Sequence, residues 1–265
     1  MKSWLPLLLM TVLAAGCTQG PDYVRPPVTD PGAYHEEADL GVSIADLPWW
    51  GLFEDPVLQD LIETALADNR DLRSSLARIA ESRARLGIVR ADLYPRLNYA
   101  ADGGVDWSSE QDGSASSAVA ALDASYQVDL WGRIKRSNEA AVQELLATEE
   151  SYRAVTIGLV SAVAQTYFLL RDLDNRLEIS EQTVESRRLS LEVVQTRFAA
   201  GMVAEVDVNQ AEIQVAEAEV SVQTFARLRS QTENALSVLL GQPPLDIERG
   251  LSLDQQLRIP EIPVG

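Results

Sequence analysis

Apolar side chains recur at a spacing of seven in two offset stripes along residues 132–240, which is the pattern of a coiled-coil seam. Small residues and a glycine interrupt the stripes at Ala199–Met202. We therefore predict two long helices folded back on each other, each with a face that needs partner helices. The first arm contributes Tyr152, Thr156, Leu159, Val163, Thr166, Leu170, Leu173, Leu177, Val184, Leu191 and Phe198, and the return arm contributes Val208, Ala211, Val215, Ala218, Val222, Phe225, Leu236 and Leu239.

The first helix of this hairpin is predicted to be unusually long. No proline occurs between Pro95 and Pro243, so the helix can run unbroken from Ile134 to Phe198. At about 1.5 Å per residue its length is roughly 100 Å. Helices of globular domains rarely exceed about 20 residues. The 265-residue chain is therefore predicted to be mainly α-helical and elongated.

Residues 94–131 change to a spacing of two, which is typical of a β-strand with one apolar face. Two such segments flank a polar loop at 108–116, and each has about the 10 residues that a tilted strand needs to cross a bilayer. We predict a transmembrane β-hairpin, while alternation also fits a hairpin in a soluble β-sandwich. The apolar positions are Leu97, Tyr99, Ala101, Val105 and Trp107 in the first segment and Ala118, Ala120, Leu122, Ala124, Tyr126 and Val128 in the second.

The aromatic residues of this hairpin occupy positions that suit the two surfaces of a membrane. Tyr94, Tyr126 and Trp131 lie near its base, and Trp107 lies near the far rim. A lone two-stranded ribbon leaves the backbone groups of its outer edges without hydrogen-bond partners, and lipid supplies none. Strands from other chains are therefore expected to complete a multi-subunit outer-membrane β-barrel.

Residues 51–93 carry two shorter amphipathic helices. Asp55 occupies an N-cap position, and Pro56 occupies the first helical position. A break at Asp68–Asn69 separates the first helix from a second one, predicted at about 71–93. The apolar face of the first helix consists of Leu58, Leu61, Ile62, Ala65 and Leu66.

The N-terminus carries a targeting pattern. Residues 1–16 combine a short basic start with an apolar run of about a dozen residues, which is too short to span a bilayer and predicts a signal peptide. The small residues before Cys17 resemble the site at which bacterial lipoproteins are cleaved and acylated, with Ala14 where leucine is usual. Residues 17–50 are then a lipidated start and an extended, proline-containing linker. The alternative is an ordinary secretory signal with an incidental cysteine.

Charge and composition exclude several classes of function. A net charge of −18 and a pI near 4.4 oppose binding to nucleic acid. With one cysteine and one histidine, His35, the chain offers no intramolecular disulfide, zinc site or cysteine–histidine nucleophile. No set of catalytic residues converges, so we expect neither an enzyme nor a cofactor or metal.

Several motifs in order resemble the TolC-type outer-membrane factors, in particular the lipoprotein branch of drug-efflux outer-membrane proteins. They include the acylation motif, the helix start at 49–62 and the helical turn at 197–211. Two further motifs are GPDYVRP at Gly20–Pro26 and YQVDLWGR at Tyr126–Arg133. The resemblance covers nearly the whole chain.

The resemblance implies a tunnel of three subunits, with a β-barrel in the outer membrane and a long α-helical barrel in the periplasm. It implies that the helical hairpin forms the barrel wall and that its tip contacts a periplasmic adaptor, which serves an inner-membrane pump. The implied function is passive export of drugs or other small molecules by a lipid-anchored outer-membrane protein. The implied tip residues are Ala200, Gly201, Met202, Val203 and Asp207, although Gly201 also fits a plain helix cap.

The chain departs from the family pattern in one respect. Family members contain two tandem copies of this arrangement, whereas only the first copy matches, and 241–265 would be a proline-rich tail leading toward the second. The family's gate, a ring of carboxylates near the tip, has no counterpart that can be assigned. We expect a truncated form that makes no stable channel alone. The alternatives are an adaptor-like periplasmic lipoprotein, whose lipoyl-type flanks are missing, and a structural coiled-coil lipoprotein without channel activity.

Overall fold

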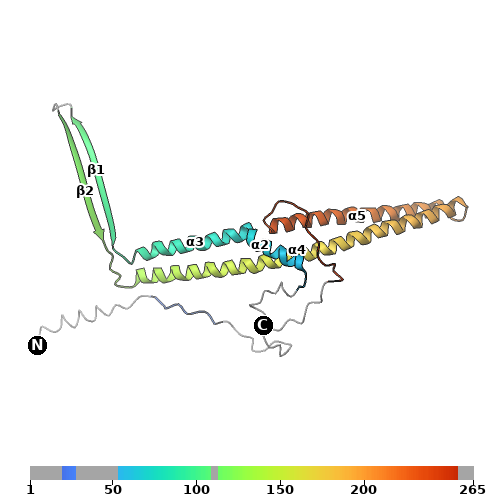
Figure 1. The fold of residues 1–265 in the computed structure, drawn as a ribbon, viewed down its shortest axis with the longest axis horizontal. Helices are drawn as coiled ribbons and strands as arrows, with labels where there is room; N and C mark the ends of the chain where they lie inside the picture. Colours follow the sequence, from blue (N-terminus) through green and yellow to red (C-terminus); the bar gives the residue numbers. More distant parts are fainter. Residues whose placement is uncertain (1–19, 28–52, 109–112, 256–265) are drawn as a thin grey trace. The chain divides into compact units, whose positions relative to one another are not determined.

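The computed structural model describes residues 20–27, 53–108 and 113–255. Its elements are α2 (Pro56–Asp68), α3 (Arg70–Ala91), β1 (Arg96–Ser108), β2 (Gly113–Ser125), α4 (Arg133–Ala199) and α5 (Glu205–Leu239) (Figure 1). The described residues form two compact units. The first unit holds segment 20–27, α3 from Leu76, both strands and α4 up to Ser151, and the second holds α2, the start of α3, the rest of α4, α5 and the segment after α5.

The predicted helical hairpin is present in the second unit, where α5 runs back along α4 (Figure 1). Helix α4 has 67 residues, and its ends lie one residue outside the predicted ones. The predicted stripes of α4 are buried at several positions from Leu159 to Val184. Toward the turn the stripe is exposed in the single chain, with Phe198 44% exposed, as the prediction of a face that needs partner helices allows. Two helices packed only on each other cannot enclose a large side chain, so the seam is open at its far end.

Helix α4 is also the one described helix that contains a window long and apolar enough, by composition, to cross a membrane. No charged residue occurs between Arg153 and Arg171. Within this run, however, Val160, Val163 and Tyr167 are buried against other helices of the second unit. Packing in a protein core therefore accounts for part of the apolar run, while Ile157 and Leu169 of the same run are exposed.

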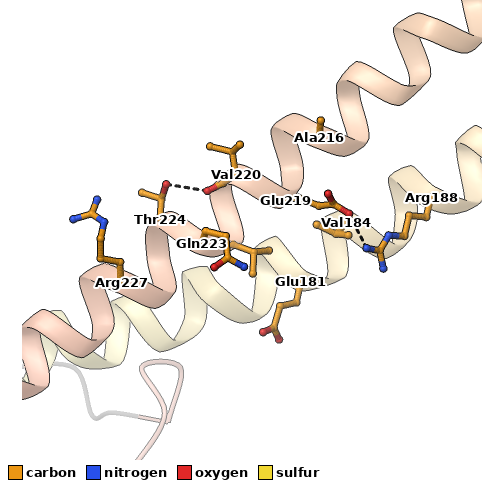
Figure 2. Close-up of a pocket in the computed structure, with 10 residues that line it drawn as sticks. Glu181, Val184, Arg188, Ala216, Glu219, Val220, Gln223, Thr224 and Arg227 are labelled. Atoms are coloured by element: carbon orange, nitrogen blue, oxygen red, sulfur yellow. Dashed lines mark hydrogen bonds and ion pairs between the residues drawn. The ribbon is translucent and has the colours of Figure 1, made fainter.

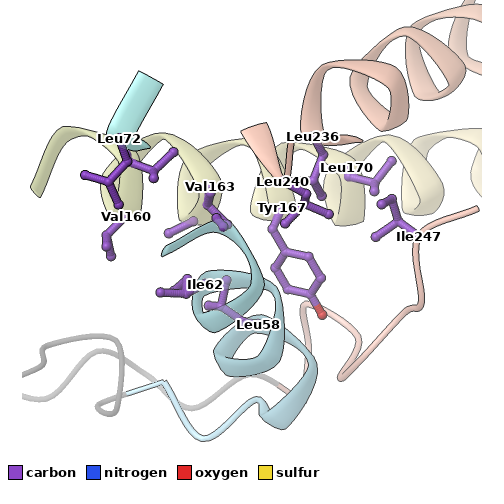
Figure 3. Packing of buried hydrophobic residues seen from close by; sticks show 13 residues of the cluster. Leu58, Ile62, Leu72, Val160, Val163, Tyr167, Leu170, Leu236, Leu240 and Ile247 are labelled. Atoms are coloured by element: carbon purple, nitrogen blue, oxygen red, sulfur yellow. The ribbon is translucent and has the colours of Figure 1, made fainter. Parts of the chain in front are cut away.

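The core of the second unit lies where α2 packs on α4 and α5 (Figure 3). Asp55 caps α2 as predicted, because its carboxylate accepts hydrogen bonds from the backbone N–H groups of Val57 and Leu58. The predicted apolar face of α2 faces this core, with Leu61 and Leu66 at its margin. Each large apolar side chain that is fully buried contributes about 1.5–3 kcal/mol. The cluster comprises Leu58, Ile62, Ala65, Leu72, Leu159, Val160, Val163, Ala164, Tyr167, Leu170, Leu236, Leu240 and Ile247.

Asn69 separates α2 from α3 at the predicted break. Its backbone N–H closes α2 on Ala65, and its side-chain oxygen accepts from the N–H groups of Asp71 and Leu72 at 2.9 and 3.0 Å. Its side-chain NH₂ donates to the carbonyl of Leu239 at 2.8 Å. One buried amide therefore ends one helix, begins the next and ties both to α5.

The β-hairpin of the first unit is antiparallel and confirms the predicted alternation. Leu97 pairs with Ala124 and Tyr99 pairs with Leu122, so the apolar positions of both strands share one face. Strand β2 begins at Gly113, inside the predicted loop, and ends at Ser125, before the predicted end. The early end has a local cause, because the next pair would place Tyr126 opposite Pro95, which has no backbone N–H to donate.

Candidate functional site

The β-hairpin presents an exposed apolar face. Leu97, Tyr99 and Leu122 lie on this face, and Tyr99 is 87% exposed. The opposite face is more polar, although Val119 is exposed on it, and there the side-chain NH₂ of Asn98 donates to the carboxylate of Asp123 at 3.4 Å. Water disfavours a continuous apolar face of this kind, whereas lipid or another protein surface accepts it. The two faces together fit a strand pair with lipid on one side and an aqueous space on the other.

The base of the hairpin brings two of the predicted interface aromatics together. Tyr94 precedes β1, and Tyr126 follows β2; with Arg96 they line one shallow pocket. Trp131 follows in the link to α4, and the rings of Tyr94, Tyr126 and Trp131 are all exposed. The backbone of Trp107 lies near the far end of β1, and its side chain is outside the described part of the structure.

The link between β2 and α4 explains the YQVDLWGR motif. The carboxylate of Asp129 accepts a hydrogen bond from the backbone N–H of Lys135 at 2.9 Å, in the first turn of α4. This hydrogen bond is the main reason why the pKa of Asp129 lies below its usual range. Gly132 adopts a φ of +77°, and the guanidinium of Arg133 donates to the side-chain oxygen of Gln127 at 3.1 Å. The motif is therefore a strand-to-helix turn with its own cap.

The tip of the helical hairpin closes with a Schellman motif. The backbone N–H of Gly201 donates to the carbonyl of Phe198 at 2.8 Å, and that of Met202 donates to the carbonyl of Arg197 at 2.9 Å. Gly201 has a φ of +70°, which glycine adopts without strain. A Cβ added at Gly201 would meet nothing within 4 Å, so the turn is open on its outer side.

The predicted tip residues have different roles. Met202 is 75% exposed, and Val206 beside it is also exposed, whereas Val203 is half-buried. The carboxylate of Asp207 accepts a hydrogen bond from the backbone N–H of Ala204 at 3.0 Å. Ala204 has no side-chain acceptor, so Asp207 alone caps the start of α5. The tip is thus a rigid turn that presents a small apolar surface.

Farther along the arms, α4 and α5 enclose an open groove of about 980 Å³ (Figure 2). Val184 and Val222 are apolar residues of its lining. Charged residues also line it, and Arg188 of α4 binds Glu219 of α5 at 2.7 Å. An apolar strip flanked by charges is the form of a surface that accepts a further helix.

The structure also contains a buried polar network that the sequence did not reveal. The hydroxyl of Tyr167 donates to the carboxylate of Asp55 at 2.7 Å and accepts from the backbone N–H of Gly250 at 3.0 Å. Burial, followed by the hydrogen bond to Asp55, raises the pKa of Tyr167 well above its usual value. A Cβ on Gly250 would lie 2.1 Å from the Asp55 carboxylate, so only glycine fits.

The segment that follows α5 is fixed to the second unit by arginines. Arg249 binds Asp174 of α4 at 2.9 Å and Glu233 of α5 at 2.6 Å. Arg171 of α4 donates to the carbonyl of Leu251 at 3.1 Å. The part of the predicted tail that is described therefore packs against the core, with Ile247 buried. The only sequence features of this segment that indicated such packing were its glycines and the prolines beside them.

Four predictions fall wholly or mostly on residues outside the described part of the structure: the signal peptide at 1–16, the lipid-attachment site Cys17, the extended linker at 17–50 apart from 20–27, and the non-catalytic assignment of His35. Among the described residues, no group of three or more His, Cys, Asp or Glu side chains is arranged to hold a metal ion.

Comparison with known proteins connects these features. The family model described as outer membrane efflux protein matches residues 61–242. The chain is 33% identical to the probable efflux pump outer membrane protein TtgC of Pseudomonas putida, covering 100% of this chain and 57% of that protein. It is 34% identical to the cation efflux system protein CusC of Escherichia coli K12, covering 89% of this chain and 53% of that protein.

A solved structure is similar to this chain both in fold and in sequence. The open state of the MtrE outer membrane channel of Neisseria gonorrhoeae matches with a TM-score of 0.77 at 30% identity, over 94% of this chain and 57% of that one. The chain thus spans somewhat more than half the length of the relatives that it matches. The match runs through α2, α3, the hairpin, α4 and α5, and on this evidence the chain belongs to the outer membrane efflux protein family.

Proposed function

We propose that this chain is a subunit of an outer-membrane channel that exports small molecules as part of an efflux pump. The observation that carries the proposal is the exposed apolar face of the β-hairpin, which includes Tyr99, in a chain of this family. The helical hairpin supplies a periplasmic wall, and the strands supply part of a barrel in lipid. The channel acts as a passive conduit, and we assign it no enzymatic activity.

The proposed location is the outer membrane, with a lipid anchor at Cys17 and the helices extending into the periplasm. The exposed rings of Tyr94, Tyr126 and Trp131 suit the membrane surface, and Trp107 would meet the opposite surface. A single acyl chain holds a protein at a membrane only weakly, so the inserted hairpin and the anchor would act together.

The proposed assembly is a homo-oligomer in which helices and strands of several copies form one wall. In support, both outer edges of the two-stranded sheet lack partners within the described chain. Ile157 and Leu169 of α4 and Val220 of α5 are exposed apolar residues, and the groove of Figure 2 adds an apolar strip. In the full-length family the resemblance implies three copies.

The proposed partners are a periplasmic adaptor, which binds the tip, and the inner-membrane pump that the adaptor serves. The tip is closed by backbone hydrogen bonds and exposes Met202 and Val206, so an adaptor helix can approach Gly201 closely. Adaptor contact would involve Ala200, Gly201, Met202, Val203 and Asp207. The Escherichia coli relative is named for cation efflux, and we assign no particular cargo to this chain.

Cysteine labelling of adjacent strand residues tests the membrane hairpin. Acylation would block the thiol of Cys17, so a new cysteine is the one reactive site. In intact outer membranes, Tyr99→Cys should react with a lipid-soluble maleimide and resist a water-soluble one, and Asn98→Cys should show the reverse preference. Slow reaction of Tyr99→Cys with both reagents would indicate a soluble β-sandwich and contradict the proposal.

Adaptor capture tests the tip. Gly201→Trp should abolish retention of the chain on an immobilised adaptor without changing the amount of chain in the outer membrane. Gln182→Trp, on an exposed part of α4 away from the turn, is the matched control for added bulk. Unchanged retention of Gly201→Trp would remove the tip as the binding site.

A further inference from the structure

The N-terminal segment 20–27 is held against the first turns of α4 by one arginine. The guanidinium of Arg136 donates to the carbonyl of Gly20 at 3.1 Å and contacts the carboxylate of Asp22 at 2.8 Å. It also binds Glu139, one turn farther along α4, at 2.7 Å. Three acceptors from two parts of the chain therefore converge on one side chain.

The arginine is the fixed member of this group. The side chain of Arg136 is 22% exposed, whereas that of Asp22 is 89% exposed. The hydrogen bonds to Glu139 and then to Asp22 raise the pKa of Arg136, so its charge is constant at every physiological pH. Glu139 binds Nη1 of the guanidinium within α4, and Nη2 contacts Gly20 and Asp22 of the N-terminal segment.

Gly20 is shaped for this contact. Its φ is +106°, a conformation that side chains other than glycine rarely adopt. This backbone bend directs the Gly20 carbonyl at Arg136. A Cβ added at Gly20 would lie 3.9 Å from Nε of Arg136. An exposed ion pair alone is weak, but the carbonyl contact and the bend add a geometric constraint that salt does not screen.

The position of this contact is close to the base of the β-hairpin. Arg136 begins the second turn of α4, where its backbone N–H donates to the carbonyl of Gly132 at 2.8 Å. Trp131 immediately precedes that glycine. Cys17 is three residues before Gly20, and three extended residues span at most about 10 Å. The contact thus limits how far the cysteine can lie from the level of the exposed aromatic rings.

We propose that Arg136 is a positioning residue that holds the acylated N-terminus beside the base of the β-hairpin, so that the lipid anchor and the aromatic rings enter the same membrane surface. The inference rests on the proposed acylation of Cys17 and the proposed membrane hairpin. The partner is the lipid of the periplasmic leaflet.

Proteolysis of the full chain in outer-membrane fragments that are open on the periplasmic side tests the contact. Chymotrypsin cleaves after Tyr23, whose ring is exposed, and mass spectrometry of the released peptide measures both the rate and the acylation of Cys17. Arg136→Gln and Asp22→Asn should each accelerate this cleavage about threefold or more, because proteolysis follows the population of the opened segment. Cleavage of the double variant should be no faster than cleavage of Arg136→Gln, since both changes break the same contact.

Arg133→Gln is the matched control, because that arginine contacts Gln127 and not the N-terminal segment. A second measurement uses nitroxide labels at Gln19→Cys and Gln143→Cys in the acylated chain. Their distance distribution should be narrow and should broaden in Arg136→Gln but not in Arg133→Gln. If Arg136→Gln is cleaved at the same rate as the wild-type chain, or if its distance distribution is unchanged, the proposal is overturned. An unmodified Cys17 would instead refute the lipid anchor, and the cleavage contrast would then report a contact without a membrane role.

Discussion

Two helix ends in this chain are closed by the same glycine turn and have opposite surroundings. At the end of α4, Gly201 has a φ of +70°, and at the end of α5, Gly241 has a φ of +72°. In each turn the glycine N–H and the following N–H donate back into the last helical turn, at 2.8 and 2.9 Å for the first and 3.0 and 3.0 Å for the second. The backbone requirement for glycine is therefore identical.

The surroundings separate the two turns. An added Cβ at Gly201 would meet nothing within 4 Å, whereas at Gly241 it would lie 2.4 Å from the carbonyl oxygen of Asp68. The Gly241 turn packs beside Asn69, whose side chain binds the carbonyl of Leu239. The same local sequence signal thus marks an open surface at one end of the helical hairpin and a closed core at the other. Adding a single methyl group at each glycine measures this difference.

The largest effect is expected for Gly241→Ala. The new Cβ combines an unfavourable φ with a backbone clash that no side-chain rotation relieves, so we expect a loss of about 3 kcal/mol or more in unfolding free energy. Thermal unfolding followed by circular dichroism measures the change. Gly87→Ala in α3, where an added Cβ meets nothing within 4 Å, is the control and should be neutral or stabilising. A small effect at Gly241 would mean that α2 and α5 separate easily.

Removal of the Tyr167 hydroxyl should have the next largest effect. Tyr167→Phe takes a hydrogen bond from the buried carboxylate of Asp55 and leaves Gly250 without its acceptor, which costs about 1–3 kcal/mol. Tyr126→Phe, at an exposed ring, is the matched control and should change stability little. Equal melting temperatures of the two variants would contradict a stabilising role for the network.

The same network predicts a dependence on pH. Its folded form needs a neutral Tyr167, whose pKa is raised, while a tyrosine in the unfolded chain ionises near pH 10. The stabilisation is therefore fully present below about pH 10 and is lost as the pH rises toward the folded pKa. The melting temperature of the wild-type chain should fall more steeply above pH 10 than that of Tyr167→Phe. Parallel curves would show that another group dominates the alkaline loss.

The core network shows where prediction from sequence ended. Asp55 was predicted as an N-cap and Asn69 as a break because both signals are local. Tyr167, the partner of Asp55, lies 112 residues away, and Gly250, which donates to Tyr167, lies farther still, and no periodic pattern links such positions. Arg249 and its acidic partners likewise had the composition of a solvated surface. The apolar face of each strand was predictable because alternation fixes which side chains share a face.

At Gly201, at the end of α4, the losses of stability should be smaller. Gly201→Ala adds only the cost of a left-handed conformation, about 1 kcal/mol, since no atom is close. Gly201→Asn should cost less, because asparagine tolerates this conformation. Thermal unfolding of both variants beside Gly241→Ala gives the comparison directly. A loss at Gly201 as large as that at Gly241 would mean that the tip is packed, and the open surface proposed for the adaptor would not exist.

The smallest effect on stability is expected for Asp207→Asn, and it sharpens the role of the tip. The amide oxygen can still accept the hydrogen bond from the N–H of Ala204, so only the interaction of the charge with the start of α5 is lost, about 0.5 kcal/mol. Asp207→Ala removes the cap as well and should lose more stability. If the adaptor recognises the charge, Asp207→Asn and Asp207→Ala should weaken adaptor binding equally despite their different melting temperatures. If binding instead falls in proportion to stability, Asp207 acts only as a cap, and the recognition surface reduces to the exposed apolar residues around Gly201.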